Sequence, residues 1–324
     1  MFFSSNWSRR LRRSLFGIPL EETTFAKRGF LAGEIGAQQR LEQIGTIFVQ
    51  GYHAALEEDH FEVLTPALQS IDSELQGFAF EGAAMGLALL DYVLPIKRRL
   101  TAFMQGPGAE HIYMVHVGAG WTLGRIPRNA RKFRQQFDPL LNWLVLDGYG
   151  FHQGFFAWNR FIGEQVQPAH LRGYELRAFD QGLGRSLWFV KGADAHQVSS
   201  TIETFPSARR GDLWSGVGLA CTYAGGVERD VIEELYYDAG AYRSHLAQGS
   251  AFAAKARQRA GNPTASTDLA CKVLTGCSSA EAARICDECL KDLSLEEQSY
   301  EHWRLRIRMR LAELPQEARQ DERV

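Results

Sequence analysis

The chain has little net charge, few cysteines and no long apolar run, and each shortage excludes a class of protein. Its 324 residues include 36 basic and 38 acidic ones, so nothing in the overall charge attracts nucleic acid. No stretch approaches the roughly 18 uninterrupted apolar residues that a membrane-spanning helix needs. Five cysteines in a chain of this length do not make a disulfide framework, so we expect reduced thiols in a cytoplasmic protein.

The common catalytic and nucleotide-binding motifs are also missing. There is no P-loop, no HExxH and no GxSxG elbow. Gly118, Gly120 and Gly124 are spaced one residue too widely for a dinucleotide-binding loop, and Trp121 would crowd a pyrophosphate. Cys286 and Cys289 lie inside a predicted helix rather than in turns, so we expect no metal site. The sequence identifies no cofactor and no catalytic residue.

A recurring glycine is the most informative feature present. It is flanked by apolar residues, is often followed two positions later by a second small residue, and recurs every 28 to 36 residues, at Gly51, Gly82, Gly118, Gly154, Gly182, Gly216 and Gly249. Repeats of this length usually hold one pair of helices each. We therefore expect these glycines to let neighbouring helices approach closely.

Local signals between the glycines predict helix ends. Asp194 with Gln197, Ser278 with Glu281, and Ser294 with Glu297 have the spacing of capping boxes. Tyr300, Trp303, Ile307 and Leu311 recur at helical spacing and predict the buried face of a last helix.

These patterns predict an all-α, α-solenoid-like protein of about seven helix-pair units. We expect an N-terminal arm at residues 1–36, a helical-repeat domain with C-terminal cap helices at 37–314, and a disordered tail at 315–324.

Polar residues beside the repeat glycines are the candidates for a ligand site, because polar groups within apolar helices must be paired or hydrated. Together with neighbouring aromatic residues they could line a groove for a small molecule. Hydrogen bonding between repeats is the competing interpretation. The candidates are Glu81, His116, His152, Gln153, Asp180, Gln181, Arg185, Trp188, Trp214 and Gln248.

The N-terminal segment RRLRRSLF, residues 9–16, is basic with interspersed apolar residues. Such a segment can lie on an anionic membrane surface, so we keep a peripheral membrane location beside packing against the repeats.

Several long segments, in order, resemble one known family. They include PLEETTFAKRGF, GFAFEGAAMGLALLD, YMVHVGAGW, LDGYGFHQGFF, FDQGLGRSLWFV and DLWSGVGLACTYAGG, and the resemblance extends from about residue 18 to about residue 312. The family is domain of unknown function 1702. Its members are found among enediyne polyketide biosynthesis genes and related bacterial clusters, commonly beside genes for a secreted-type repeat protein and a multi-spanning membrane protein.

The resemblance implies a role in making or tailoring a polyene-derived secondary metabolite, and it implies no particular reaction. A hydrophobic polyene is therefore the expected small-molecule partner. The alternative is a non-catalytic scaffold that binds other biosynthetic or membrane proteins, since helical solenoids often present concave binding surfaces. A closed apolar cavity behind the glycines would favour the first function, and an open concave surface would favour the second.

Overall fold

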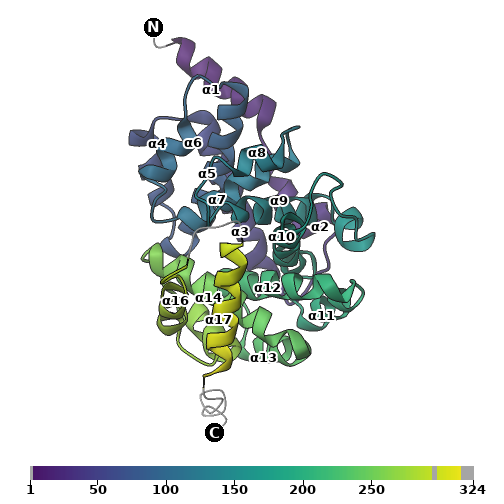
Figure 1. Ribbon diagram of the computed structural model, residues 1–324. Coiled ribbons are helices and arrows are strands. Elements are labelled where there is room, and N and C mark those ends of the chain that lie inside the picture. The colour runs from purple at the N-terminus through teal and green to yellow at the C-terminus, as the bar shows by residue number, and fades with distance from the viewer. Residues whose placement is uncertain (1–2, 294–297, 315–324) are drawn as a thin grey trace.

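The computed structural model describes residues 3–293 and 298–314, and every regular element in these ranges is helical (Figure 1). The prediction of an all-α fold is confirmed. The predicted helix start at Ser294 and the tail at 315–324 lie outside the described residues. Among the described helices, none combines the length and the apolar character needed to cross a bilayer.

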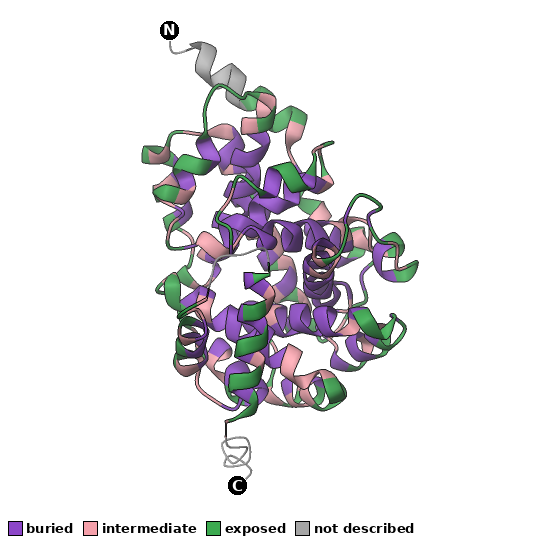
Figure 2. Ribbon diagram, viewed as in Figure 1, coloured by how far each residue is buried: buried purple, intermediate pink, exposed green. Residues whose placement is uncertain are grey.

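Seven helix pairs follow one another, each with an inner helix and a shorter outer element. They are α3 (Ile35–Glu57) with α4 (Phe61–Gln69), α5 (Ser73–Val93) with α6 (Arg99–Gln105), α7 (Ile112–Trp121) with α8 (Ala130–Arg134), α9 (Trp143–Phe156) with the π-helical turn η3 (Asn159–Gly163), α10 (Tyr174–Val190) with α11 (Ala195–Glu203), α12 (Ser207–Ala224) with α13 (Arg229–Asp238), and α14 (Arg243–Arg259) with α15 (Ala265–Thr275). The inner helices are largely buried (Figure 2).

Shorter elements precede, join and follow the pairs. They are α1 (Phe3–Phe16), η1 (Leu20–Thr23), α2 (Phe25–Arg28), η2 (Thr122–Gly124), η4 (Gly240–Tyr242), α16 (Ser279–Glu288) and α17 (Ser299–Ala312). The predicted caps form, because Asp194 accepts a hydrogen bond from the Gln197 amide at 2.9 Å and Ser278 accepts one from the Glu281 amide at 3.2 Å. All four residues predicted for the face of α17 are buried.

Small residues set the spacing of the inner helices. In α7, a Cβ atom on Gly118 would lie 2.0 Å from the Glu81 carbonyl oxygen of α5, and one on Gly120 would lie 2.0 Å from the Val145 carbonyl oxygen of α9. From α5 to α12, each inner helix thus contacts the previous inner helix through one small residue and the next one through another, two positions later.

The contacts correct the predicted glycine register in two units. In α9 the contacts are made by Gly148 and Gly150, whereas a Cβ on Gly154 would meet the Ser186 side chain; in α3, Gly51 takes the second position. The first positions of the seven units are Val49, Gly82, Gly118, Gly148, Gly182, Gly216 and Gly249.

The row of inner helices closes on itself. The Arg40 side chain of α3 donates a hydrogen bond to the Ala224 carbonyl oxygen at the end of α12, at 3.0 Å. Helix α14 continues past this closure, and Arg257 donates to the Glu74 carbonyl oxygen of α5 at 3.1 Å. The inner helices from α3 to α12 therefore form a ring, with α14 and α17 packed at one end (Figure 1).

Candidate functional site

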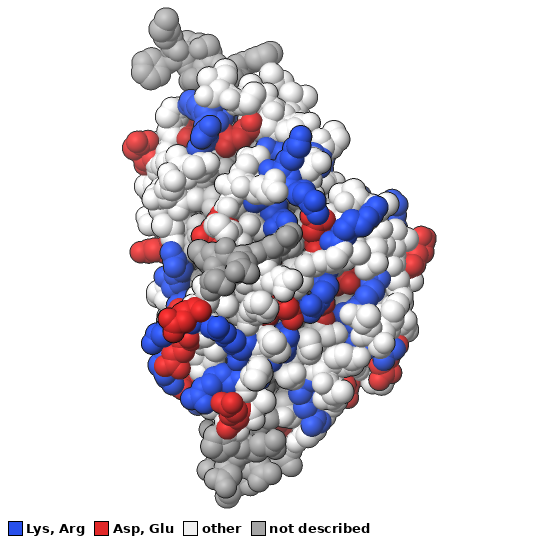
Figure 3. All heavy atoms as spheres, in the orientation of Figure 1, with Lys and Arg blue, Asp and Glu red and all other residues white. Residues whose placement is uncertain are grey.

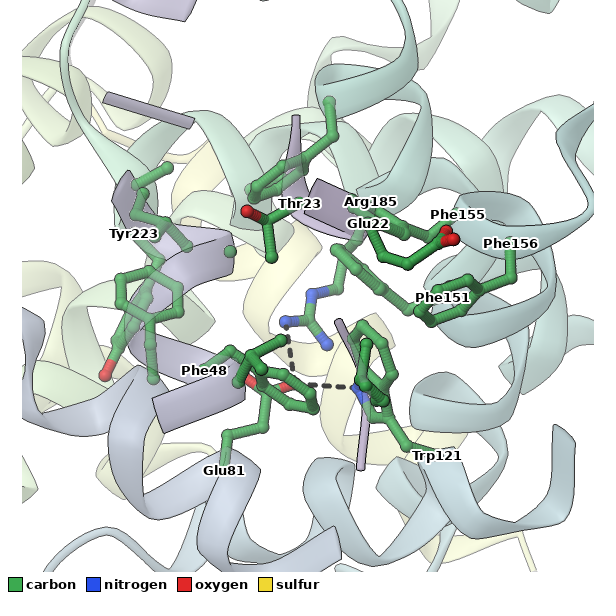
Figure 4. Close-up of a pocket in the computed structure, with 18 of the residues that line it drawn as sticks. Glu22, Thr23, Phe48, Glu81, Trp121, Phe151, Phe155, Phe156, Arg185 and Tyr223 are labelled. Carbon is green, nitrogen blue, oxygen red and sulfur yellow. Dashed lines mark hydrogen bonds and ion pairs between the residues drawn. The ribbon is translucent and has the colours of Figure 1, made fainter. Parts of the chain in front are cut away.

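A narrow apolar cavity of about 40 Å³ lies inside the ring, towards the C-terminal ends of α7, α9, α10 and α12. Figure 4 shows aromatic rings surrounding it, with the Arg185 guanidinium and the Glu81 carboxyl group at its centre. The aromatic lining residues are Phe48, Phe78, Trp121, Phe151, Phe155, Phe156, Phe189 and Tyr223. An apolar lining with a few convergent polar groups is typical of a small-molecule site.

The corrected register explains why several of these side chains face the cavity. Residues one position before and three positions after the first small residue lie on the same helix face, because positions four apart are neighbours on a helix. Glu81 and Phe48 occupy the earlier position, and Trp121, Phe151 and Arg185 occupy the later one. We call these two positions, in all seven units, the inner stripe.

Glu81 is held in the cavity by two neighbours. The Trp121 indole nitrogen donates a hydrogen bond to Glu81 Oε1 at 3.0 Å, and an Arg185 terminal nitrogen lies 3.9 Å from the same oxygen (Figure 4). Burial nevertheless raises the pKa of Glu81 to about 7, against the opposing effects of Arg185 and Trp121. A carboxyl group with a pKa near neutrality is suited to donating and accepting protons.

Arg185 links Glu81 to a second buried carboxylate. It donates to Asp147 Oδ1 at 2.6 Å, and its guanidinium lies 5.0 Å from the Phe151 ring centroid. Although burial opposes its charge, the two carboxylates raise the pKa of Arg185, so it stays protonated. Among the described residues, none accepts a hydrogen bond from Arg185 Nε or pairs with the Tyr223 hydroxyl group. These buried polar atoms leave capacity to bind a polar group of a ligand or water.

A second apolar cavity, of about 30 Å³, lies on the other side of Arg185. Arg185, Leu219 and Tyr223 line both cavities. Its remaining walls come from α7, α9, α14 and α17, and include Tyr113, Met114, Val117, Leu144, Phe252, Tyr300 and Trp303. Movement of the three shared side chains would join the two spaces into one elongated channel.

The inner stripe continues as a polar row beyond the cavities. Gln181 donates to Asp147 Oδ2 at 2.9 Å and contacts the Tyr300 hydroxyl group at 3.3 Å. Further along, Gln248 Oε1 accepts hydrogen bonds from Ser215 at 2.9 Å and from Arg304 at 2.9 Å. Because these polar groups are largely paired with one another, they hold the inner helices in register.

Residues 17–34, which we call the strap, cross the mouth of the first cavity. Ile18, Glu22 and Thr23 of the strap line the cavity. Arg28 donates to the Phe155 and Phe156 carbonyl oxygens at 3.1 and 2.7 Å, and the Leu31 amide donates to the Val190 carbonyl oxygen at 3.0 Å. The strap is thereby fastened to the C-terminal ends of α9 and α10.

The ten residues predicted from the sequence fall into two groups. Glu81 and Arg185 line the first cavity, and Gln181 and Gln248 belong to the polar row of the inner stripe. The others are absent from the lining of both cavities: His116, His152, Gln153, Asp180, Trp188 and Trp214.

Two of these outlying groups have clear structural partners. Asp180 accepts two hydrogen bonds from Arg209, at 2.8 and 2.6 Å. His116 Nδ1 contacts the Ile112 carbonyl oxygen at 2.7 Å, and burial lowers the pKa of His116 to about 4. Burial also lowers the pKa of His152 to about 3, so both imidazoles are neutral near pH 7.

Asp147 is the site residue that sequence reasoning missed. It follows the inner-stripe pattern one position before Gly148, but its Asp-Gly-Tyr-Gly context was too common to single out. Asp147 is recognised once Gly148 and Gly150 are taken as the helix-contact glycines of α9. Taking Gly154 instead places Asp147 outside the repeated pattern.

Among the described residues, two groups of side chains have the spacing of metal ligands, one of them partly buried and the other exposed. They are Glu58, Asp59 and His60, and His196, Glu234 and Asp238. Asp59 already pairs with Arg99 at 2.5 Å, and Asp238 accepts a hydrogen bond from Ser199 at 2.6 Å. Neither group borders the two cavities.

Fold and site together define an all-α repeat protein closed around an apolar cavity that contains a buried carboxyl–guanidinium cluster. Residues 7–311 match the family described as protein of unknown function, DUF1702, and the chain belongs to that family. No curated protein and no solved structure matches the chain.

Proposed function

We propose that this protein binds a long, thin, unsaturated polyketide-derived chain inside the ring, as a step in the biosynthesis of an enediyne or a related polyene-derived metabolite. The main observation in support is the cavity itself, which is lined by aromatic rings and has Glu81 and Arg185 among its polar groups. Flat, conjugated ligands stack well on such rings, and the buried pair supplies a proton-exchanging group and a cation. The resemblance to an enediyne-associated family supports the metabolite class.

The size of the cavity adds a condition to this proposal. A volume of about 40 Å³ holds only a few carbon atoms, so a longer chain needs the strap to move and the two cavities to join at Arg185, Leu219 and Tyr223. Two apolar spaces joined end to end at these side chains would suit a linear polyene better than a compact or branched molecule.

Ring closure also bears on the alternative scaffold function. A solenoid that binds proteins on its concave side needs that side to be open. Here the inner face is buried, and α14 and α17 occupy one end of the ring. This burial supports the small-molecule proposal over a scaffold that uses the concave face.

A fluorescence titration with parinaric acid, a linear conjugated tetraene, tests the proposal. The probe becomes strongly fluorescent in an apolar site, so we expect a saturable rise in its emission. Ala220→Leu places extra carbons in the first cavity and should weaken binding by about tenfold, the effect of displacing about two buried methylene groups.

The matched control is Ala247→Leu, a buried alanine on the inner helix α14 that lines neither cavity. Its affinity should stay within about twofold of the unmodified protein, since no cavity volume is lost. Absence of saturable binding, or equal losses in the two variants, would refute the cavity as the polyene site.

A further inference from the structure

An exposed apolar and basic surface lies at the end of the molecule that carries α1, and none of its residues lines either cavity. Its residues come from α1 and from the loop between α5 and α6, and they are Arg10, Leu11, Leu15, Leu94, Ile96, Lys97 and Arg98. We call this surface the docking face. Figure 1 shows α1 at the extremity of the molecule, above α4 and α6.

The two elements of the docking face are fastened together through one carboxylate. Asp59 lies 3.7 Å from Arg12 of α1, 3.6 Å from Lys97 of the loop and 2.5 Å from Arg99 at the start of α6. Helix α1 and the loop between α5 and α6 are far apart in the sequence but are therefore held next to each other by ion pairs to Asp59.

The aliphatic side chains of the docking face point away from the protein. Ile96 is 93% exposed at the tip of its loop, and Leu15 is 64% exposed. Leu11 and Leu15 are four residues apart and so share one face of α1, while Phe16 packs against the core on another face. Exposed aliphatic groups that gather at one end of a molecule, unlike singly scattered ones, are typical of a surface that contacts a membrane or another molecule.

The charges around these aliphatic groups are mainly positive. Arg10, Lys97 and Arg98 are exposed, and Arg13 pairs with Glu57 beside them. On the face seen in Figure 3, basic and acidic side chains are intermixed, in keeping with the small net charge of the chain. Basic residues flanking exposed aliphatic groups match the headgroups and the acyl boundary of an anionic bilayer.

We infer that the docking face binds the surface of an anionic membrane, with Leu11, Leu15 and Ile96 inserted at the acyl boundary and the basic side chains at the phosphate level. This binding is peripheral, because α1 and the loop can enter only the interface. The inference does not depend on the polyene proposal, since none of the docking-face residues lines either cavity.

Co-sedimentation of the full chain with lipid vesicles tests the inference. We expect binding to phosphatidylcholine vesicles containing about one third phosphatidylglycerol to be at least about tenfold stronger than binding to pure phosphatidylcholine, and to weaken at high salt. Leu15→Asp combined with Ile96→Asp should reduce binding to the anionic vesicles by about tenfold or more.

The matched control is Leu305→Asp combined with Met309→Asp, which places the same charges on exposed aliphatic positions of α17. This variant should bind like the unmodified protein, and circular dichroism should show equal helix content in both variants. Failure of the unmodified protein to sediment with anionic vesicles, or an equal loss in the control variant, would overturn the inference. So would a wild-type oligomer that the docking-face variant alone dissociates, since a second copy would then cover the face.

Discussion

Glu81 combines two properties that rarely occur together, complete burial among aromatic rings and a pKa near neutrality. The folded state keeps a proton on this group up to a pH of about 7, whereas the unfolded chain loses it near pH 4.5. Because the folded state binds more protons between these values, this group makes the free energy of unfolding fall as the pH rises through that window. Its contribution falls by about 3 kcal/mol in total.

Glu81→Gln removes this titration, so the stability of the variant relative to the unmodified protein should increase between pH 4.5 and pH 7. Urea unfolding of both proteins across this range measures the difference in their free energies of unfolding. The buried histidines are the same in both proteins, so their contributions cancel in this difference. Glu62→Gln, at an exposed position, is the control and should give a pH-independent difference. A constant difference for Glu81→Gln would mean that Glu81 is ionised in the folded protein.

Polarity within an apolar helix is the sequence signal that selects Glu81, Gln181, Arg185 and Gln248, and the structure places all four on the inner stripe. That these residues bind a ligand stays a prediction. His116 and Asp180 carry the same signal but lie off the inner stripe, because each is one position further from its glycine. One residue rotates a side chain by about 100° around a helix, which turns it from the inner stripe towards the outer elements.

Among the helices, the closest contact made by an inner-helix glycine is at Gly182. A Cβ atom there would lie 1.7 Å from the Asp147 carbonyl oxygen. In an unconstrained helix, Gly→Ala stabilises by about 0.5 to 1 kcal/mol. At Gly182 we expect the opposite sign, a loss of about 3 kcal/mol or more, because two backbones must separate.

Thermal and urea unfolding of Gly182→Ala measure this loss, and Gly163→Ala is the matched control. Gly163 ends the π-helical turn η3 with nothing within 4 Å of its Cβ position, so its replacement should be neutral or slightly stabilising. A Gly182→Ala variant as stable as the control would show that the helices do not depend on this close approach.

Element boundaries were accessible to sequence reasoning because caps are local. Asp194 and Ser278 form the hydrogen bonds that their spacing predicts. The register within an element was less accessible, since α9 contains three glycines, Gly148, Gly150 and Gly154, at helical positions. The three glycines differ in what they face: Gly148 and Gly150 face a carbonyl group of a neighbouring helix, whereas Gly154 faces the Ser186 side chain. The sequence does not display this difference.

At the scale of the whole molecule, ring closure distinguishes this protein from an open solenoid. The repeat period predicts stacked helix pairs, but curvature depends on small rotations between repeats that the sequence does not display. The closing contacts join residues far apart in the chain, such as Arg40 with Ala224 and Arg257 with Glu74. Sequence reasoning therefore identified the repeats and left open whether their inner face was closed.

Closure should also make unfolding more cooperative than in an open repeat array, where terminal repeats unravel separately. We expect a single urea transition in which far-ultraviolet circular dichroism and tryptophan fluorescence coincide. Arg40→Met removes the bond to α12 and the ion pair with Glu74. It should lower the free energy of unfolding by about 1 to 2 kcal/mol, and with it the urea midpoint, while the two probes still coincide. Distinct midpoints for the two probes in the unmodified protein would show that the ring opens before it unfolds.

Because the small residues keep a fixed register, the residues that pack the inner helices together largely differ from the residues that line the cavity. Backbone contacts at the small-residue positions hold the helices together, whereas part of the cavity wall lies on the inner stripe, at constant offsets from those positions. The inner-stripe residues in the wall of the first cavity are Phe48, Glu81, Trp121, Phe151, Arg185 and Leu219. The lining side chains of one helix can therefore be replaced without a change in how the helices pack. In another chain with the same register, the residues at these positions would identify part of its cavity wall, and their bulk and polarity would limit which molecules that cavity accommodates.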